Sequence, residues 1–405
     1  MCSWRAGARA ADTTVTPAAK DVSRIATPRP PSRRHRRWVV VVLAAILLGP
    51  GVSYGRALAY PGSASWQMRS VEWFRGHGGS GVVNAVENWY YTIQPPTGSA
   101  PDPASLPVVP ARLARSLPAR SGTGSRHHHR PPTALPVLAG RSAVRGEGRW
   151  VSGRLGASGV PAIYTSFFRP DPAHPSVVAG VAWMRARATY AHLVAGTVEP
   201  PGAGWSRAGH VPANEVPALV ATFNSGWTLN DAHGGFYLSG RGAGSLRDGQ
   251  ASLVIDDHGR VTLGRWGREV AMSPHVVAVR QNLALIVDHG RPVAGLSSNV
   301  GQRWGNAKNQ YQYTWRSGAG IDATGNLVYV AGADLTLKAL AAALTDAGAV
   351  RGMELDIHTV MVSFSSWAPS ARGSVTPTKL LPQMNRSADR YLAADQRDFF
   401  YLTLR

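Results

Sequence analysis

The sequence holds a single cysteine, Cys2, among its 405 residues. One cysteine cannot form an intrachain disulfide or a cysteine-based metal site, so neither of these can stabilise the fold. The sequence also lacks a P-loop, a dinucleotide-binding glycine fingerprint, a zinc-protease helix motif and a Gly-x-Ser-x-Gly nucleophile elbow. The reaction classes that depend on those motifs are therefore not indicated, and Cys2 is assigned no role.

Acidic residues are scarce, 23 against 43 Lys and Arg, and the formal net charge is +20. Such an excess suggests nucleic-acid binding, but the charge is unevenly placed. Residues 1–37 hold nine basic and two acidic residues, and residues 111–154 hold nine arginines and one glutamate. Residues 155–405 hold 22 basic and 17 acidic residues. We therefore expect no nucleic-acid binding by the folded part, and basic segments that meet a membrane or an anionic envelope.

The N-terminal segment predicts a membrane anchor. Residues 1–37 are rich in Ala, Thr, Pro and Arg and predict a disordered, basic cytoplasmic tail. The cluster Arg-Arg-His-Arg-Arg at 33–37 precedes an apolar run, which predicts a transmembrane signal-anchor over 38–60 and an extracytoplasmic C-terminal part. The alternative is a signal peptide cleaved after the Ala-Leu-Ala of 57–59 and a secreted protein. The first reading predicts a single-pass protein of the cell membrane.

Two segments separate this anchor from the main domain. Residues 61–94 are rich in aromatic and aliphatic side chains at helical spacings, and the glycines of 76–81 divide them into two short helices. This juxtamembrane helical segment lies on the membrane surface or docks on the main domain. Residues 95–147 are rich in Pro and Arg and predict a flexible linker, in which the three histidines of 127–129 have no assigned function.

Residues 148–405 predict an α+β fold, a strand-dominated single globular domain with few helices. Short alternating apolar runs bounded by Gly and Asp predict strands at 162–168, 177–183, 190–194, 218–223 and 252–255. Three hairpins are expected at 252–263, 283–293 and 320–330. Apolar residues at spacings of three and four predict one helix over 336–347, which ends at a glycine and leads into a strand at 353–358.

That last strand, Met-Glu-Leu-Asp-Ile-His, carries the strongest chemical signal in the sequence. Strand side chains alternate between two faces, so Glu354, Asp356 and His358 are expected on one face, about 7 Å from one to the next. Two carboxylates and an imidazole suit an acid/base or metal-assisted hydrolase. The alternative is an ordinary antiparallel strand with one solvated face.

Four segments follow one another in the domain: Val-Ala-Thr-Phe-Asn-Ser-Gly-Trp at 220–227, Trp-Arg-Ser-Gly-Ala-Gly-Ile-Asp at 315–322, Leu-Thr-Leu-Lys-Ala-Leu-Ala at 335–341 and Gly-Met-Glu-Leu-Asp-Ile-His-Thr at 352–359. Together, in this order, they resemble the phosphodiester glycosidase family, whose members hydrolyse sugar-phosphate diesters such as N-acetylglucosamine-1-phosphodiesters. The resemblance covers about residues 160–405.

The resemblance implies roles for particular residues. Arg316 would clamp a phosphate, because arginine offers a fixed bidentate cation, and an ion pair with Asp322 or Glu354 is the alternative. Asp356 would be the family carboxylate, acting as a base, a nucleophile or a metal ligand. Asn224, at a strand end, would bind a sugar hydroxyl or a phosphate oxygen, or else would be a turn residue.

The sequence also departs from the family pattern, which identifies a divergent branch. Ile-His-Thr at 357–359 replaces three glycines, so we expect the strand to continue past Asp356 and a phosphate-binding backbone turn to be lost. Glu354 and Asp356 are close enough in sequence for repulsion to raise the pKa of one of them. His358 could donate a proton or bind a metal, or be a structural histidine.

The remaining candidates are loop and aromatic residues. Gly226 is included with the substrate-binding group, as is Trp315, which alternates with Tyr311 and Tyr313 and could stack on a sugar ring or pack in the core. His233 lies in a glycine-rich loop that could close over a ligand. The acids of 256–257 and Asp322 are expected to serve turns.

The prediction that combines these features is an extracytoplasmic, membrane-anchored phosphodiester-glycosidase-like hydrolase. Its catalytic residues would be Asp356, Glu354 and His358, and its partners a sugar-phosphate linkage of an envelope glycan and, through the N-terminal helix, the membrane. No cofactor is assigned, and a divalent metal is left open. The alternative is a non-catalytic, glycan-binding envelope module on the same fold.

Overall fold

The computed structural model describes residues 38, 48–62, 64–93, 95–108, 131–299, 301–305, 312–370 and 373–405. The chain divides into two units, Met1–Gly55 and Arg56–Arg405. In the first unit, residues 48–55 are helical, while the predicted tail at 1–37 and residues 39–47 of the predicted anchor lie outside the described residues. Among the described residues, no helix is both long and apolar enough to cross a membrane.

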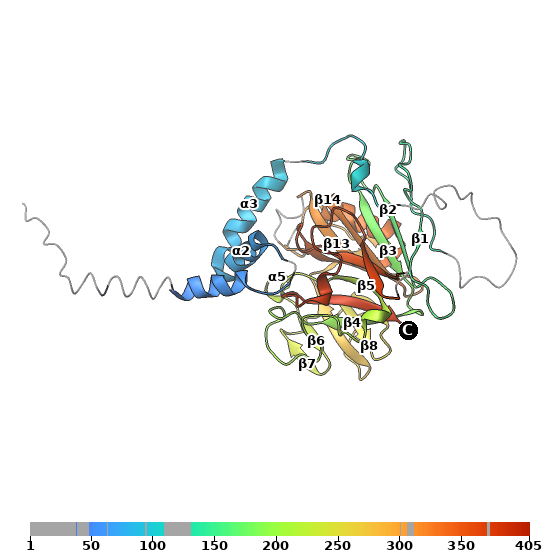
Figure 1. Cartoon of the computed structure of the whole chain (residues 1–405). Helices are drawn as coiled ribbons and strands as arrows, with labels where there is room; N and C mark the ends of the chain where they lie inside the picture. The colour runs from blue at the N-terminus through green and yellow to red at the C-terminus, as the bar shows by residue number, and fades with distance from the viewer. Residues whose placement is uncertain are drawn as a thin grey trace, which may run out of the picture. The chain divides into compact units, whose positions relative to one another are not determined.

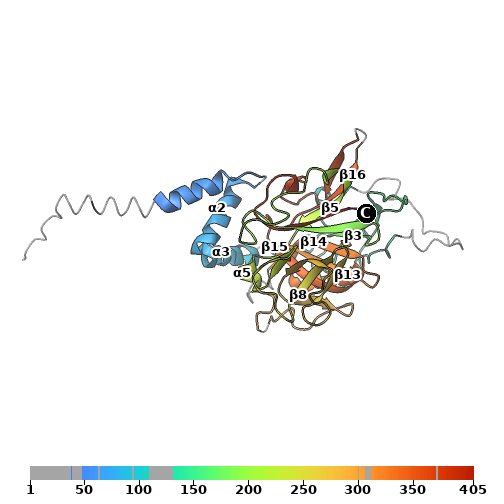
Figure 2. The ribbon, with the colours of Figure 1, turned by 90° about the horizontal axis from the view of Figure 1, so that it is seen from below.

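The second unit begins with a helical pair, drawn blue to cyan in Figure 1 and seen from below in Figure 2. Helix α2 (Trp66–Phe74) begins at Ser65, whose side chain accepts a hydrogen bond from the backbone N–H of Met68. A π-helical turn (Arg75–Gly79) leads into α3 (Ser80–Ile93), and Gly78 takes a φ of 88° there. The glycine-rich break predicted at 76–81 is therefore present as this turn.

Strands dominate the rest of the unit and form three sheets, in which all strand pairs between described residues are antiparallel. The eight-stranded sheet has the order β1 (Val151–Ser152), β2 (Ile163–Phe168), β3 (Ala179–Met184), β14 (Leu327–Leu335), β13 (Thr314–Asp322), β15 (Ala349–Ile357), β11 (Leu285–Asp288), β12 (Arg291–Pro292). One five-stranded sheet has the order β7 (Arg241–Ala243), β6 (Phe236–Leu238), β10 (Val276–Gln281), β8 (Ala251–Asp256), β9 (Val261–Arg265). The other has the order β17 (Val375–Lys379), β16 (Phe364–Pro369), β5 (Leu219–Asn224), β18 (Phe399–Leu404), β4 (Thr189–Val194).

The described part of this unit otherwise contains short helices and one longer one. The short elements are α5 (Leu229–Ala232) and the 3-10 turns Pro103–Ser105, Val216–Ala218 and Arg390–Leu392. The prediction of a strand-dominated domain with few helices is confirmed. The expected strands correspond to β2, β3, β4, β5 and β8, and the expected hairpins to β8–β9, β11–β12 and β13–β14.

Helix α6 (Leu337–Asp346) covers one face of the eight-stranded sheet. The side chain of Thr336 accepts a hydrogen bond from the backbone N–H of Ala339 and caps the first turn. Leu344 and other apolar residues of α6 belong to a buried cluster with residues of β3 and β14. A Cβ atom at Gly318 would lie 2.9 Å from the Leu344 side chain, so this glycine allows the helix to approach β13 closely.

A second buried cluster contains residues from all three sheets, including Phe223 of β5, Leu253 of β8 and Leu355 of β15. The eight-stranded sheet is consequently buried on both faces near its middle. Every residue of β15 from 352 to 357 is buried, so the solvated strand face, which was the alternative to a catalytic role for Glu354 and Asp356, is absent.

The start of the domain differs from the expected boundary at residue 148. Leu135 and Leu138, expected in the linker, are buried. The carboxylate of Glu147 is also buried and forms an ion pair with Arg169 at 2.9 Å. Residues 131–147 therefore pack on the domain, whereas residues 109–130 and the histidines of 127–129 lie outside the described residues.

Candidate functional site

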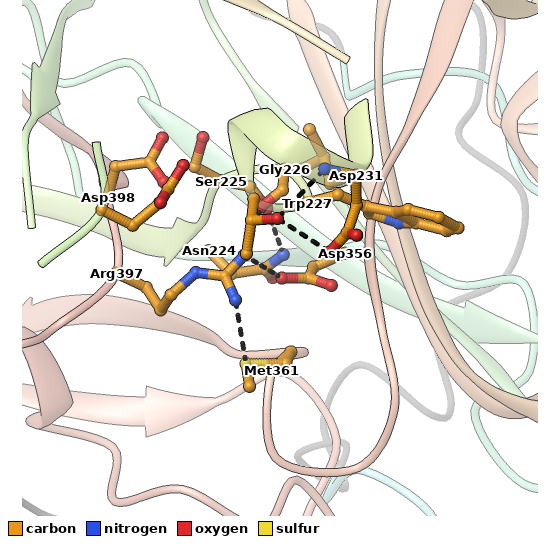
Figure 3. A network of polar contacts seen from close by, with 12 residues as sticks. Asn224, Ser225, Gly226, Trp227, Asp231, Asp356, Met361, Arg397 and Asp398 are labelled. Atoms are coloured by element: carbon orange, nitrogen blue, oxygen red, sulfur yellow. Dashed lines mark hydrogen bonds and ion pairs between the residues drawn. The ribbon is translucent and has the colours of Figure 1, made fainter. Parts of the chain in front are cut away.

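Asp356 lies one residue before the end of β15 and pairs with an arginine from a distant part of the chain. Its Oδ2 accepts a hydrogen bond from Nη2 of Arg397 at 2.9 Å, and its Oδ1 accepts one from the backbone N–H of Ile357 at 2.9 Å. Arg397 lies two residues before the start of β18 and also donates to the carbonyl oxygen of Gly226 at 3.0 Å. Figure 3 shows the guanidinium between Asp356 and Met361. One arginine thus joins the ends of β15 and β5.

Burial raises the pKa of Asp356 to about 7. Arg397 and the Ile357 N–H favour the ionised carboxylate and lower that pKa, but they do not offset the loss of water around a group that is only 8% exposed. For Arg397 itself, burial acts to lower the pKa, while Asp356 and Glu72 hold it above its usual value. Asp356 can therefore give or accept a proton near neutral pH beside a permanently charged cation.

The expected repulsion between Glu354 and Asp356 is not the cause of this raised pKa. Between β13 and β15 the pairing changes from Arg316↔Ile357 to Gly318↔Glu354, which leaves one extra residue in β15. Such a bulge breaks the strict alternation of faces. The two carboxylates consequently have different partners, Arg397 for Asp356 and Arg316 for Glu354.

Arg316 and Glu354 form a fully buried ion pair. Nη1 of Arg316 donates to Oε1 of Glu354 at 2.6 Å, and its Nε donates to the carbonyl oxygen of Leu335 at 2.7 Å. Burial raises the pKa of Glu354, and Arg316 lowers it. The structure thus has the ion pair that was the alternative to a phosphate clamp, and it encloses both side chains in the protein.

Asn224, the last residue of β5, lies close to Asp356 through Ser317. Its Nδ2 donates to Ser317 Oγ at 3.0 Å, and that hydroxyl donates to the carbonyl oxygen of Asp356 at 2.9 Å. Oδ1 of Asn224 accepts from the Tyr329 hydroxyl and from the Ser363 N–H. Asn224 therefore ties strand ends together, and it has no positive φ of the kind a left-handed turn residue would show.

Gly226 lies against Asn282, a residue that contacts β15. A Cβ atom here would be 2.8 Å from Cγ of Asn282. The Asn282 amide donates to the carbonyl oxygens of Glu354 and Leu355, at 2.6 and 2.8 Å. The missing side chain at Gly226 therefore leaves room for the residue that supports the bulge.

His358 follows the end of β15 and does not extend it, which corrects the expectation of a continuous strand. Its φ is +76°, so this histidine adopts the backbone conformation that glycine adopts most easily. Its ring stacks on Tyr91 of α3, with 5.9 Å between centroids, and its Nε2 lies 3.4 Å from Glu87 of α3. Burial and nearby Arg75 lower the pKa of His358 to about 3, so the ring is neutral at pH 7.

Helix α2, the residues just before it and the C-terminal segment line a small cavity of about 30 Å³ beside Arg397. Glu72 and Arg69 of α2 line it, together with Arg386 and Arg390, which both bind Asp395. No pattern in the sequence selects Arg397 or Glu72 as a site residue. Neither lies in a recognisable motif, and each acquires its neighbours only through the fold.

The other candidates are dispersed. Trp315 is buried, and its carbonyl oxygen accepts the N–H of His358 at 2.8 Å. Tyr311 lies outside the described residues, and Tyr313 meets His174 edge-on. His233 ends α5 with a φ of 51° and is exposed.

The described residues contain one group of side chains that could hold a metal ion, at the β8–β9 turn. It consists of Asp256, Asp257 and His258, whose ligand atoms lie within 4.8 Å of one another. Asp257 also accepts hydrogen bonds from His258 and His275, and Asp256 accepts from backbone N–H groups of the turn. These contacts fit the turn role predicted for the two acids.

No protein-family model matches the sequence, and no curated protein matches it either. Solved structures give distant matches. The catalytic domain of zebrafish N-acetylglucosamine-1-phosphodiester alpha-N-acetylglucosaminidase, auto-inhibited by its pro-peptide, matches with a TM-score of 0.40 and 16% identity, over 63% of this chain and 87% of that one. A protein from Synechocystis matches with a TM-score of 0.37 and 13% identity over 56% of this chain, which spans 59% of its length. A Burkholderia pseudomallei protein described as exported matches with a TM-score of 0.34 and 13% identity, over 56% of this chain and 74% of that one.

Proposed function

We propose that this chain is a hydrolase of sugar-phosphate linkages in envelope glycans, with its strand-rich domain outside the cytoplasm and residues 38–60 as its membrane anchor. The single observation that carries the proposal is the buried pair of Asp356, with a pKa of about 7, and Arg397. A group that titrates near neutral pH suits general acid/base catalysis, and a fixed guanidinium suits a phosphate. The resemblance of four sequence segments to phosphodiester glycosidases supports the same substrate class.

Arg397 has donors left for a ligand. Its Nη2 serves Asp356 and Gly226, its Nη1 meets the Met361 sulfur at 3.9 Å, and its Nε has no hydrogen-bond partner among the described residues. Nε and Nη1 lie on different edges of the guanidinium, and each has an N–H group that can donate to a phosphate oxygen. We therefore assign the phosphate-binding role to Arg397, and to Arg316 the support of β13 and β15.

In the proposed reaction, water attacks the anomeric carbon while the bond from that carbon to the phosphate oxygen breaks. Ionised Asp356 takes a proton from the water, and Arg397 stabilises the charge that develops on the departing phosphate. The products are a free sugar and a phosphate monoester. Asn224 and Gly226 hold the strand ends, and His358 and Glu354 contribute no proton.

The cavity beside Arg397 is far smaller than the roughly 300 Å³ or more of an ordinary ligand site. Substrate entry would therefore require α2 to move away from the C-terminal segment. The same enclosure favours the second candidate, a non-catalytic module that binds glycans elsewhere on the domain, because that function needs no access to Asp356.

The test is release of free sugar from an N-acetylglucosamine-1-phosphodiester by the full chain. Asp356→Asn should lower the rate at least about 100-fold, and Arg397→Gln should lower it comparably. Matched controls are Asp257→Asn, in an exposed turn, and Arg268→Gln, which is exposed, and both should retain the parent rate. Equal rates in Asp356→Asn and the parent chain would reject the hydrolase and leave the binding module.

A further inference from the structure

The helices α2 and α3 expose an unusual share of large apolar side chains. Among the described residues 17 such side chains are exposed, and eight of them lie between residues 66 and 93. The others in the domain proper, such as Val198 and Met272, occur singly along the rest of the chain. Scattered exposed apolar residues need no explanation, whereas a cluster on one element marks a contact surface.

On α3 these residues form one stripe, Val82, Val86, Trp89, Tyr90 and Ile93. At 3.6 residues per turn their positions fall within about 100° of the helix circumference. Val86 is 56% and Trp89 is 64% exposed. We call these five residues of α3 the outer stripe.

The opposite side of α3 is used by the domain. Glu87 and Tyr91 project from positions roughly 120° or more away from the centre of the outer stripe, and both contact His358. Glu87 is the only charged residue of α3, and it also pairs with Arg75 at 2.5 Å. The outer stripe therefore carries no charge, and packing of α3 on the domain does not cover it.

Composition and sequence context favour a lipid surface as the partner. Trp and Tyr among aliphatic residues are typical of the membrane interface, where their rings meet both apolar and polar groups. In the sequence, the basic cluster at 33–37 is followed by an apolar run that starts at residue 38, and the helical pair comes after this run. A chain that enters a bilayer at this run would keep the next helices close to the same surface.

We propose that the outer stripe of α3 lies in the head-group region of a lipid bilayer, as an interfacial contact separate from the anchor. The inner side of α3, through Glu87 and Tyr91, then fixes the end of β15 next to the membrane. This inference does not depend on the proposed hydrolysis.

The test uses the scarcity of cysteine. In a Cys2→Ser background, Val86→Cys and Leu155→Cys each carry one nitrobenzoxadiazole label, and the two parent side chains are similarly exposed, at 56% and 54%. Both full-length variants are placed in vesicles of phosphatidylethanolamine and phosphatidylglycerol that contain a nitroxide lipid. Any contribution of the anchor is common to both, and thermal unfolding confirms that both are folded.

The label at Val86 should shift its emission to shorter wavelength in vesicles, and it should be quenched more by a nitroxide near the head group than by one near the chain end, because interfacial helices enter only about 5–10 Å. The label at Leu155 should do neither. Two results would overturn the proposal. In one, the Val86 label behaves like the Leu155 label. In the other, the nitroxide lipids do not quench the Val86 label and energy is transferred between labels on different copies of the chain, which identifies a protein interface.

Discussion

The buried pair of Arg316 and Glu354 permits the sharpest test of which charged residues support the fold. Both side chains are fully buried, and the guanidinium also donates to the Leu335 carbonyl oxygen. Arg316→Met removes the cation and leaves a carboxyl group in an apolar site. We expect the free energy of unfolding to fall by roughly 3–5 kcal/mol, the usual loss when one partner of a buried pair is removed.

Two further variants test whether the loss of stability comes from leaving one buried charge without its partner. The double variant Arg316→Met/Glu354→Leu removes both charges and should recover most of the loss, because apolar packing replaces a buried pair at little net cost. Arg265→Met breaks a partly exposed pair with Glu269 and should lose no more than about 1 kcal/mol.

The loss in Arg316→Met should also depend on pH. Burial already raises the pKa of Glu354 above its ordinary value of 4.5, and removal of Arg316 raises it further. A group whose pKa is raised by folding stabilises the folded state fully below its unfolded pKa, and that contribution is lost as the pH rises through the folded pKa. The deficit of the variant should therefore be smallest near the ordinary pKa and grow as the pH rises above it.

Urea unfolding of the full chain in detergent, followed by tryptophan fluorescence at about pH 5 and about pH 8, measures both effects. A loss in Arg316→Met no larger than that in Arg265→Met would refute the structural role. The phosphate-clamp role predicted for Arg316 would then be the better explanation.

Three further predictions follow from the site and its supports. In carbon-13 NMR of the carboxyl groups, one aspartate signal should titrate near pH 7, and this signal should be lost in Asp356→Asn. Its pKa should rise in Arg397→Gln, because Arg397 lowers the pKa that burial raises. Titration of this signal at the ordinary pKa of an aspartate would contradict the burial argument. His358→Gly should be more stable than His358→Ala by about 1 kcal/mol in urea unfolding, because both variants delete the ring and only glycine accepts a φ of +76° without strain. Equal urea midpoints for the two variants would show that the backbone at residue 358 is not strained. Thr336→Ala should lower stability by about 1 kcal/mol while Thr336→Ser retains the cap of α6, and a matching loss in the serine variant would exclude the cap as the cause.

Much of the domain was predictable because its signals are local. The turn after Asp256, the hairpin after β13 and the helix that begins at Thr336 are each specified by neighbouring residues, and each is present at the expected place. The glycine-rich break between the two N-terminal helices is equally local. The burial of both faces of β15 was not predictable from the alternating pattern, because that pattern marks a strand with one face toward water, and here a helix covers one face and other strands cover the other.

The sequence by itself determined most of the strands and helices of the domain, the segments in which the positive charge is concentrated, and the selection of Asp356 as a candidate catalytic residue. Only the tertiary structure decided which cation Asp356 meets, because Arg397 is 41 residues away and in no motif. It also decided that a bulge separates Glu354 from Asp356, and that α3 covers His358 with one side and exposes an apolar stripe on the other. The physical reason is that ion pairs and the loss of water around a carboxylate depend on distances between segments, which local periodicity does not contain.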